Sequence, residues 1–125
     1  MINDEVISII ADEFRETITQ NYGILRCRMH NWGDSASTMY LWVMYYNQMV
    51  ATITISMAYI ATQCKIKCEP RSWNWAEPSK YEFDMADPAW DPKHAVDVAV
   101  SWIMPQIRNF IKSDYVHDNG LREKP

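Results

Sequence analysis

The chain switches between two hydrophobic periods, and their order predicts a helix at each end with strands between them. Apolar side chains recur every three to four residues over 3–20 and again after residue 92, as in amphipathic helices. In between, apolar and polar side chains alternate over segments near 25–30, 38–46, 50–59, 63–69 and 80–85, as in β-strands. We therefore expect an α+β fold with a four- to five-stranded antiparallel meander.

The last helix has a clear predicted start and a predicted interruption. Asp91 followed by Pro92 places an acidic cap before a proline in the first turn, which is typical of a helix start. Pro105 lies within the apolar stripe that follows, and its ring would clash with the carbonyl of Ser101. We expect the C-terminal helix to be kinked or broken at Pro105.

The length of 125 residues suits one domain with its own core. The segment 114–125 has no apolar period. We expect a single domain over 1–113 and a flexible tail over 114–125.

The register of the hairpin between the second and third strands predicts which face of the sheet is the core. A two-residue loop at Asn47-Gln48 would put Trp42 on the same side as Ile53. Trp42 is then a core residue. If side chains alternate between the two faces along every strand in this register, the helix-covered face is made of Leu25, Cys27, Met29, Tyr40, Trp42, Met44, Ile53, Ile55, Met57, Cys64, Ile66 and Cys68.

The opposite face of the sheet is the candidate binding surface. Covering both faces with only two helices is hard, so this face is either exposed to solvent or a partner surface. Its apolar middle and charged sides resemble an interface, so we expect it to contact a protein partner. Its candidate residues are Arg26, Arg28, Leu41, Val43, Tyr45, Lys65 and Lys67.

Three tryptophans in predicted loops form a second candidate surface, because tryptophan is common among the residues that dominate binding energy. They are Trp73, Trp75 and Trp90. The alternative, equally open, is that they pack over the edge of the core.

The net charge of −4 conceals a basic middle, residues 24–71, between acidic flanks. A basic sheet face with aromatic side chains can bind single-stranded nucleic acid. However, the predicted register puts Tyr40 and Trp42 in the core, and the acidic flanks would repel phosphates. A nucleic-acid or nucleotide binder is therefore the alternative function, and nucleic acid is not the expected partner.

The sequence assigns no catalytic, cofactor or metal site. Cys64 and Cys68 would lie about 13 Å apart along one strand, too far to share a metal ion or a disulfide. With only three glycines, the chain can form neither a dinucleotide-binding fingerprint nor a phosphate-binding loop. An enzyme with an unfamiliar site is the third hypothesis.

The combined pattern favours a small non-enzymatic adaptor or inhibitor that binds a protein partner, with a homodimer through the exposed sheet face as one form of it. Compact, aromatic-rich chains without motifs are typical of phage or mobile-element proteins that block host machinery. The odd number of cysteines favours the reducing cytoplasm, including that of a host. No apolar stretch is long enough to span a membrane.

Overall fold

The structure is a computed structural model that describes residues 3–32, 38–57, 63–71 and 79–112. The expected tail, residues 114–125, lies outside this range. Within it, two helices flank five strands in the order α1 (Asn3–Asn21), β1 (Leu25–Trp32), β2 (Thr38–Tyr45), β3 (Gln48–Met57), β4 (Gln63–Pro70), β5 (Ser79–Asp84) and α2 (Pro92–Ile111).

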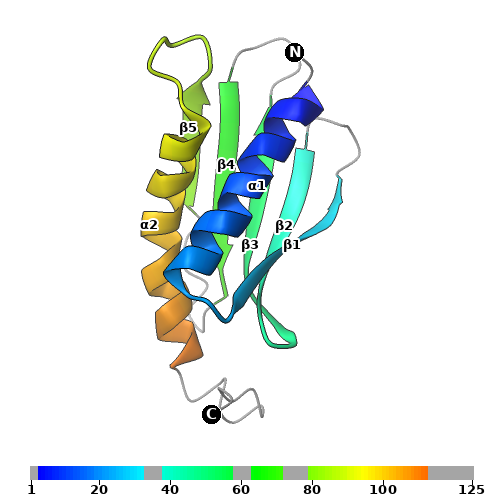
Figure 1. The fold of residues 1–125 in the computed structure, drawn as a ribbon, viewed down its shortest axis with the longest axis vertical. Coiled ribbons are helices and arrows are strands. Elements are labelled where there is room, and N and C mark those ends of the chain that lie inside the picture. The colour runs from blue at the N-terminus through cyan, green and yellow to red at the C-terminus, as the bar shows by residue number, and fades with distance from the viewer. Residues whose placement is uncertain (1–2, 33–37, 58–62, 72–78, 113–125) are drawn as a thin grey trace.

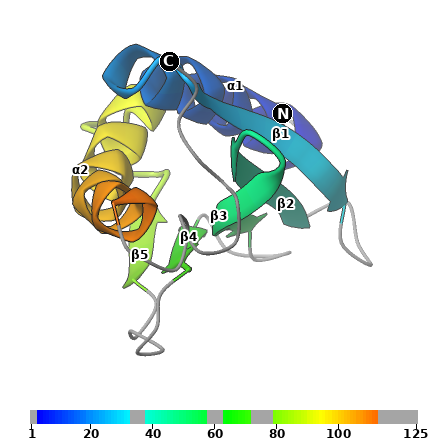
Figure 2. The same ribbon diagram turned by 90° about the horizontal axis from the view of Figure 1, so that it is seen from below.

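The strands form one antiparallel sheet in which each pairs only with its neighbours in the sequence, in the order β1-β2-β3-β4-β5. Both helices lie on the same face of this sheet (Figure 1), α1 over β1 to β3 and α2 over β3 to β5, and they pack against each other. The sheet curves around them (Figure 2). The predicted α+β meander with a helix at each end is confirmed.

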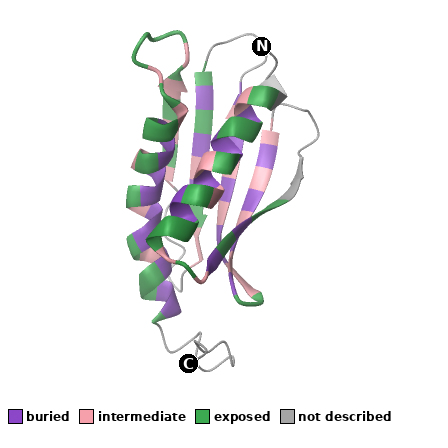
Figure 3. Ribbon diagram, viewed as in Figure 1, coloured by how far each residue is buried: buried purple, intermediate pink, exposed green. Residues whose placement is uncertain are grey.

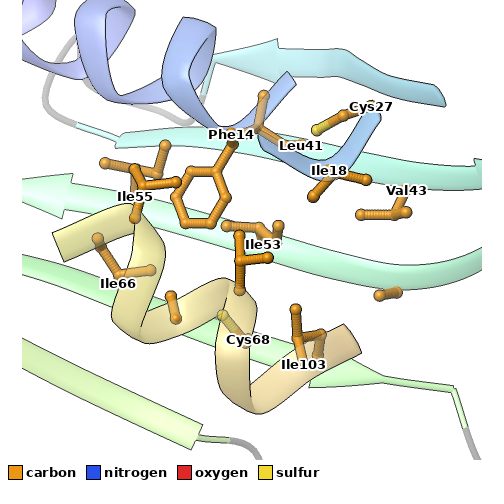
Figure 4. Packing of buried hydrophobic residues seen from close by; sticks show 14 of the residues in the cluster. Phe14, Ile18, Cys27, Leu41, Val43, Ile53, Ile55, Ile66, Cys68 and Ile103 are labelled. Atoms are coloured by element: carbon orange, nitrogen blue, oxygen red, sulfur yellow. The ribbon is translucent and has the colours of Figure 1, made fainter. Parts of the chain in front are cut away.

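The core fills the space between the helices and the sheet. The buried residues of each helix recur along the side that faces the strands (Figure 3), as its amphipathic period requires. Its fully buried side chains include Phe14 from α1, Ile53 and Ile55 from β3, Ile66 from β4 and Ile103 from α2 (Figure 4). Burial of one such side chain stabilises the fold by about 1.5–3 kcal/mol.

The start of α2 follows the predicted capping pattern, but the helix is not broken. The Asp91 carboxylate accepts a hydrogen bond from the backbone N–H of Lys93 at 3.2 Å, and Pro92 occupies the first turn. The helix continues through Pro105 to Ile111, so of the two predicted alternatives, a kink or a break, the break is wrong. Pro105 is exposed, so water can satisfy the carbonyl that its missing N–H leaves without a partner.

The hairpin between β2 and β3 differs from the predicted one in the position of its turn, which is not Asn47-Gln48, and by a β-bulge. Its turn is Tyr46-Asn47, and Tyr46 has a left-handed φ of 53°, as a two-residue hairpin turn requires at its first central position. Next to the turn Met44 lies opposite Met49, but Val43 lies opposite Ala51. Val50 is therefore the extra residue of a bulge.

The bulge reverses the face assignment of β2, because one added residue changes the side-chain parity relative to β3. Leu41, Val43 and Tyr45 are exposed by only 0, 0 and 1%, and Figure 4 shows Leu41 and Val43 within the core cluster. Their predicted position on the uncovered face is wrong.

The side chains that alternate with them were predicted in the core and lie on the other side of the sheet. Tyr40, Trp42 and Met44 are half-buried there. The predicted core position of Met29 is also wrong, since its exposure is 42%. Figure 1 shows β1 diverging from α1 toward its C-terminal end, so the helix does not cover that part of the strand.

The predicted faces of β3 and β4 are correct, as is that of the first part of β1. The residues placed in the core and found buried are Leu25, Cys27, Ile53, Ile55, Met57, Cys64, Ile66 and Cys68.

The polarity of the β2 side chains explains why the bulged register is favoured. A buried tyrosine hydroxyl or tryptophan N–H needs a hydrogen-bond partner, whereas leucine and valine have no polar atom to satisfy. The observed register buries Leu41 and Val43 beneath the helices and leaves Tyr40 and Trp42 near solvent; Tyr45, next to the turn, is the exception and is buried.

We predict that Leu41→Ala lowers the free energy of unfolding by about 2–5 kcal/mol, because it leaves a cavity between the sheet and the helices. Met44→Ala, on the opposite face of the same strand, should cost less than half of that loss. Chemical denaturation of both variants measures the difference. Equal losses would contradict the register.

Candidate protein-binding surface

The face of the sheet opposite the helices is called the open face here. Residues directly opposite one another on neighbouring strands share a face, so the register defines its members. Its central residues are Tyr40, Trp42, Met44, Thr52, Thr54 and Ser56, and its charged residues are Arg26, Arg28, Lys65, Lys67, Glu69, Lys80, Glu82 and Asp84.

Two cross-strand rows run through the middle of the open face. In one row Arg28 lies opposite Trp42, which lies opposite Thr52. In the other Tyr40 lies opposite Thr54, which lies opposite Lys67. Direct neighbours in such rows are about 5 Å apart at Cβ, so Trp42 lies next to both Arg28 and Thr52, whereas Tyr40 lies next to Thr54 and one strand further from Lys67.

The charges along β4 and β5 are of both signs. Lys65 Nζ lies 3.8 Å from Glu82 Oε1, and Lys67 Nζ lies 3.2 Å from Glu69 Oε1. All four side chains are substantially exposed, so these pairs contribute little to stability. They do mean that a ligand on this side of the face meets carboxylates as well as ammonium groups.

The charges along β1 are only positive. Arg26 is exposed, and its Nη1 donates to the backbone carbonyls of Gly23 and Leu25. Arg28 is exposed and forms no ion pair with any residue that the structure describes. The open face therefore has a cationic side at β1 and a mixed side at β4 and β5.

The structure brings four of the predicted site residues together on the open face: Arg26, Arg28, Lys65 and Lys67. The three apolar ones predicted between them, Leu41, Val43 and Tyr45, lie in the core instead.

Of the three loop tryptophans, only Trp90 falls within the described residues. It is half-buried, packs against the core and lies 6.0 Å from the ring of Phe83, which is itself 6.3 Å from the ring of Tyr81. This position matches packing over the edge of the core. Trp73 and Trp75 lie outside the residues that the structure describes.

Sequence reasoning missed the aromatic centre of the open face. Tyr40, Trp42 and Met44 occupy the place that had been assigned to their neighbours on β2. The available signal was the pair Val50 and Ala51, two adjacent apolar residues that interrupt the alternation of the third strand. Such a pair fits a bulge whose two residues both face the core.

The three cysteines are buried, unpaired thiols. Burial away from water raises the pKa of Cys64 from 9.0 to about 11 and that of Cys68 to about 12. Burial likewise raises the pKa of Cys27 to about 12, although the nearby positive charge of Arg15 lowers it. Protonated thiols are poor nucleophiles and poor metal ligands, so these side chains act as small hydrophobic groups.

The described side chains show no grouping of three or more histidine, cysteine or acidic residues that could hold a metal ion. None of the described helices is both long enough and apolar enough to cross a membrane.

Comparison with known proteins gives no relative. No family model, curated protein or solved structure matches the chain.

We predict that the folded protein does not react with a thiol reagent such as Ellman's reagent at neutral pH. The thiols are buried and remain protonated there. In denaturant all three should react rapidly, which absorbance measures directly. Rapid modification of even one thiol in the folded protein would contradict this placement.

The raised thiol pKa values also predict a loss of stability in alkali. Above pH 9.0 the thiols of the unfolded chain lose protons that the folded chain retains until about pH 11–12. Alkali therefore favours unfolding, by up to about 1.4 kcal/mol per pH unit for each thiol. Urea denaturation from about pH 8 to about pH 11 measures this decline, which should be shallower in Cys68→Ala. An identical slope in that variant would contradict it.

Proposed function

We propose that the protein is a small non-enzymatic module that binds a protein partner through the open face. The observation that carries the proposal is the position of Tyr40 and Trp42. These two aromatic side chains lie half-buried in the middle of a sheet face that neither helix covers.

The composition of the open face supports a protein partner. Tyrosine, tryptophan, methionine and arginine are enriched in protein interfaces. Tyrosine, tryptophan and arginine are also the residues that most often dominate the binding energy of an interface. Tyr40, Trp42 and Met44 form the centre, with Arg26 and Arg28 beside them on β1. Central aromatic and apolar residues with charges at the sides have the anatomy of an interface core and its rim.

The charges favour a protein over a nucleic acid. The corrected register removes one argument against nucleic acid, because Tyr40 and Trp42 are on the same face as the cations. Glu69 and Glu82 nevertheless lie beside Lys67 and Lys65, so a phosphate backbone crossing β4 and β5 would meet carboxylates. A protein surface with charges of both signs can complement this side.

The thiols support a binding role in a reducing compartment. Cys27, Cys64 and Cys68 are unpaired, as expected of a cytoplasmic protein. Their raised pKa values make them unsuited to nucleophilic catalysis. An adaptor or inhibitor of cytoplasmic machinery, including that of a host, fits these features.

We predict that the double variant Tyr40→Ala, Trp42→Ala loses its protein partner. Truncation of a central aromatic side chain commonly costs 2 kcal/mol or more, which is on the order of 30-fold in affinity. Capture from a lysate of the organism that encodes the protein, with quantitative mass spectrometry, identifies proteins retained by the wild type and lost by the variant. Calorimetry with the purified partner then gives the change in Kd.

Ile9→Ala is the matched control, because Ile9 is an exposed hydrophobic residue on α1, away from the open face. It should retain the partner fully. Thermal unfolding shows whether the open-face variant is folded. A partner that binds the folded double variant at full strength would refute the proposal.

Thr54→Arg separates a protein from a nucleic acid. Thr54 lies between Tyr40 and Lys67, so an arginine there adds bulk and positive charge at the centre of the open face. It should block protein docking but strengthen binding to a single-stranded oligonucleotide, measured by fluorescence anisotropy at two salt concentrations. Salt-dependent oligonucleotide binding by the wild type, lost in Trp42→Ala, would assign the face to nucleic acid instead.

A further inference from the structure

The edge of β1 is a second surface of the sheet, formed by backbone rather than side chains. β1 pairs with β2 on one side only and is the outermost strand of the sheet at that end (Figure 1). An edge strand has backbone N–H and C=O groups that point away from the sheet and can pair with another extended chain.

Hydrogen bonds at the start of β1 show which backbone groups point outward. The backbone N–H of Leu25 donates to the Tyr22 carbonyl at 2.9 Å, and the Leu25 carbonyl accepts from Arg26 Nη1 at 2.8 Å. Both groups of Leu25 are therefore used outside the pairing with β2.

The direction of the backbone groups alternates along an antiparallel strand, so the groups of Cys27 and Met29 also point outward. Within the described residues, neither forms a backbone hydrogen bond outside the sheet and helices. The outward edge at Cys27 and Met29 is thus available for pairing.

The side chains that flank this edge differ on the two faces of the sheet. On the open face, Arg28 is exposed and has no ion-pair partner among the described residues. On the helix side, where Met29 lies opposite the buried Leu41, the Met29 side chain is 42% exposed. A strand paired with β1 would therefore lie beside a positive charge on one face and an apolar side chain on the other.

We propose that the edge of β1 binds an extended acidic segment of another protein by strand addition, with acidic side chains beside Arg28 and apolar ones beside Met29. Opposite charges on neighbouring strands attract, and β-strand addition is a common mode of peptide recognition. This inference does not depend on the open-face proposal, since it rests on the backbone of a different strand.

A second copy of the chain fits the edge poorly. In an antiparallel pairing of two β1 strands around Cys27, Arg26 of each copy would lie opposite Arg28 of the other. Like charges in that position destabilise the pairing. The register irregularity between Met29 and Asn31 also shortens the regular edge, which is a common protection against self-association. These features disfavour a second copy of the chain as the partner of this edge, whereas an acidic strand would be attracted to it.

The test uses the full chain, labelled with ¹⁵N, and two short capped peptides of alternating Glu-Val and Lys-Val. The Glu-Val peptide should shift the amide signals of Cys27 and Met29 and slow their hydrogen exchange. The Lys-Val peptide should bind with an affinity at least about tenfold lower than that of the Glu-Val peptide. The absence of any effect of the Glu-Val peptide on these two amides would overturn the proposal. Protection that appears on concentrating the protein alone would also overturn it, in favour of a second copy.

Two variants make the test specific. Met29→Pro removes an outward N–H that β2 does not use, so the protein should stay folded and lose peptide binding, whereas Met29→Ala keeps the N–H and should retain it. Arg28→Glu should reverse the preference toward the Lys-Val peptide. Equal binding by folded Met29→Pro would refute strand addition. The Tyr40→Ala, Trp42→Ala variant should bind the Glu-Val peptide as the wild type does. The open-face proposal and the edge proposal can therefore fail independently of each other.

Discussion

The extra residue Val50 determines the side-chain arrangement of half the sheet. It lies just after the turn that joins β2 to β3, and with Ala51 it turns two adjacent apolar side chains into the core. The bulge determines on which face of the sheet the β2 side chains from Val43 back to Thr38 lie. Leu41 and Val43 pack beneath the helices as a result, and the aromatic rings between them form the centre of the open face. Both the core and the candidate binding surface depend on this local irregularity.

The sequence predicted the faces of a strand correctly wherever apolar and polar side chains alternate strictly along it. β1 and β4 alternate cationic with apolar side chains, so Arg26, Arg28, Lys65 and Lys67 could be assigned to one face correctly. The helices were equally clear, since their apolar residues recur at the helical period. β2 is apolar on both faces and has no alternation of its own, so its orientation had to be taken from the hairpin. An error of one residue in that hairpin then moved Tyr40 and Trp42 into the core and their neighbours out of it.

The fold converts the charge pattern of the sequence into a difference between two sides of the molecule. The acidic segment at the start of the chain forms α1, whose exposed side bears Glu5, Asp12 and Glu16, away from the sheet. The basic segment forms β1 to β4, and Arg26, Arg28, Lys65 and Lys67 lie on the face opposite the helices. The acidic segment at the start of the chain therefore lies away from the open face, whereas the acidic segment after residue 71 contributes Glu82 and Asp84 of β5 to it. Such a separation of charge can orient an approaching partner before contact is made.

The meander also has a consequence for how the chain folds as it is synthesised. Each strand pairs with the one made just before it, so the sheet can grow hairpin by hairpin with contacts that are close in sequence. The apolar side of β4 is covered by α2, which also covers part of β3 and is the last of the described elements to be made. Until that helix leaves the ribosome, Ile53, Ile66 and Cys68 have no cover from it. Early release of the nascent chain would therefore expose a sheet surface prone to aggregation.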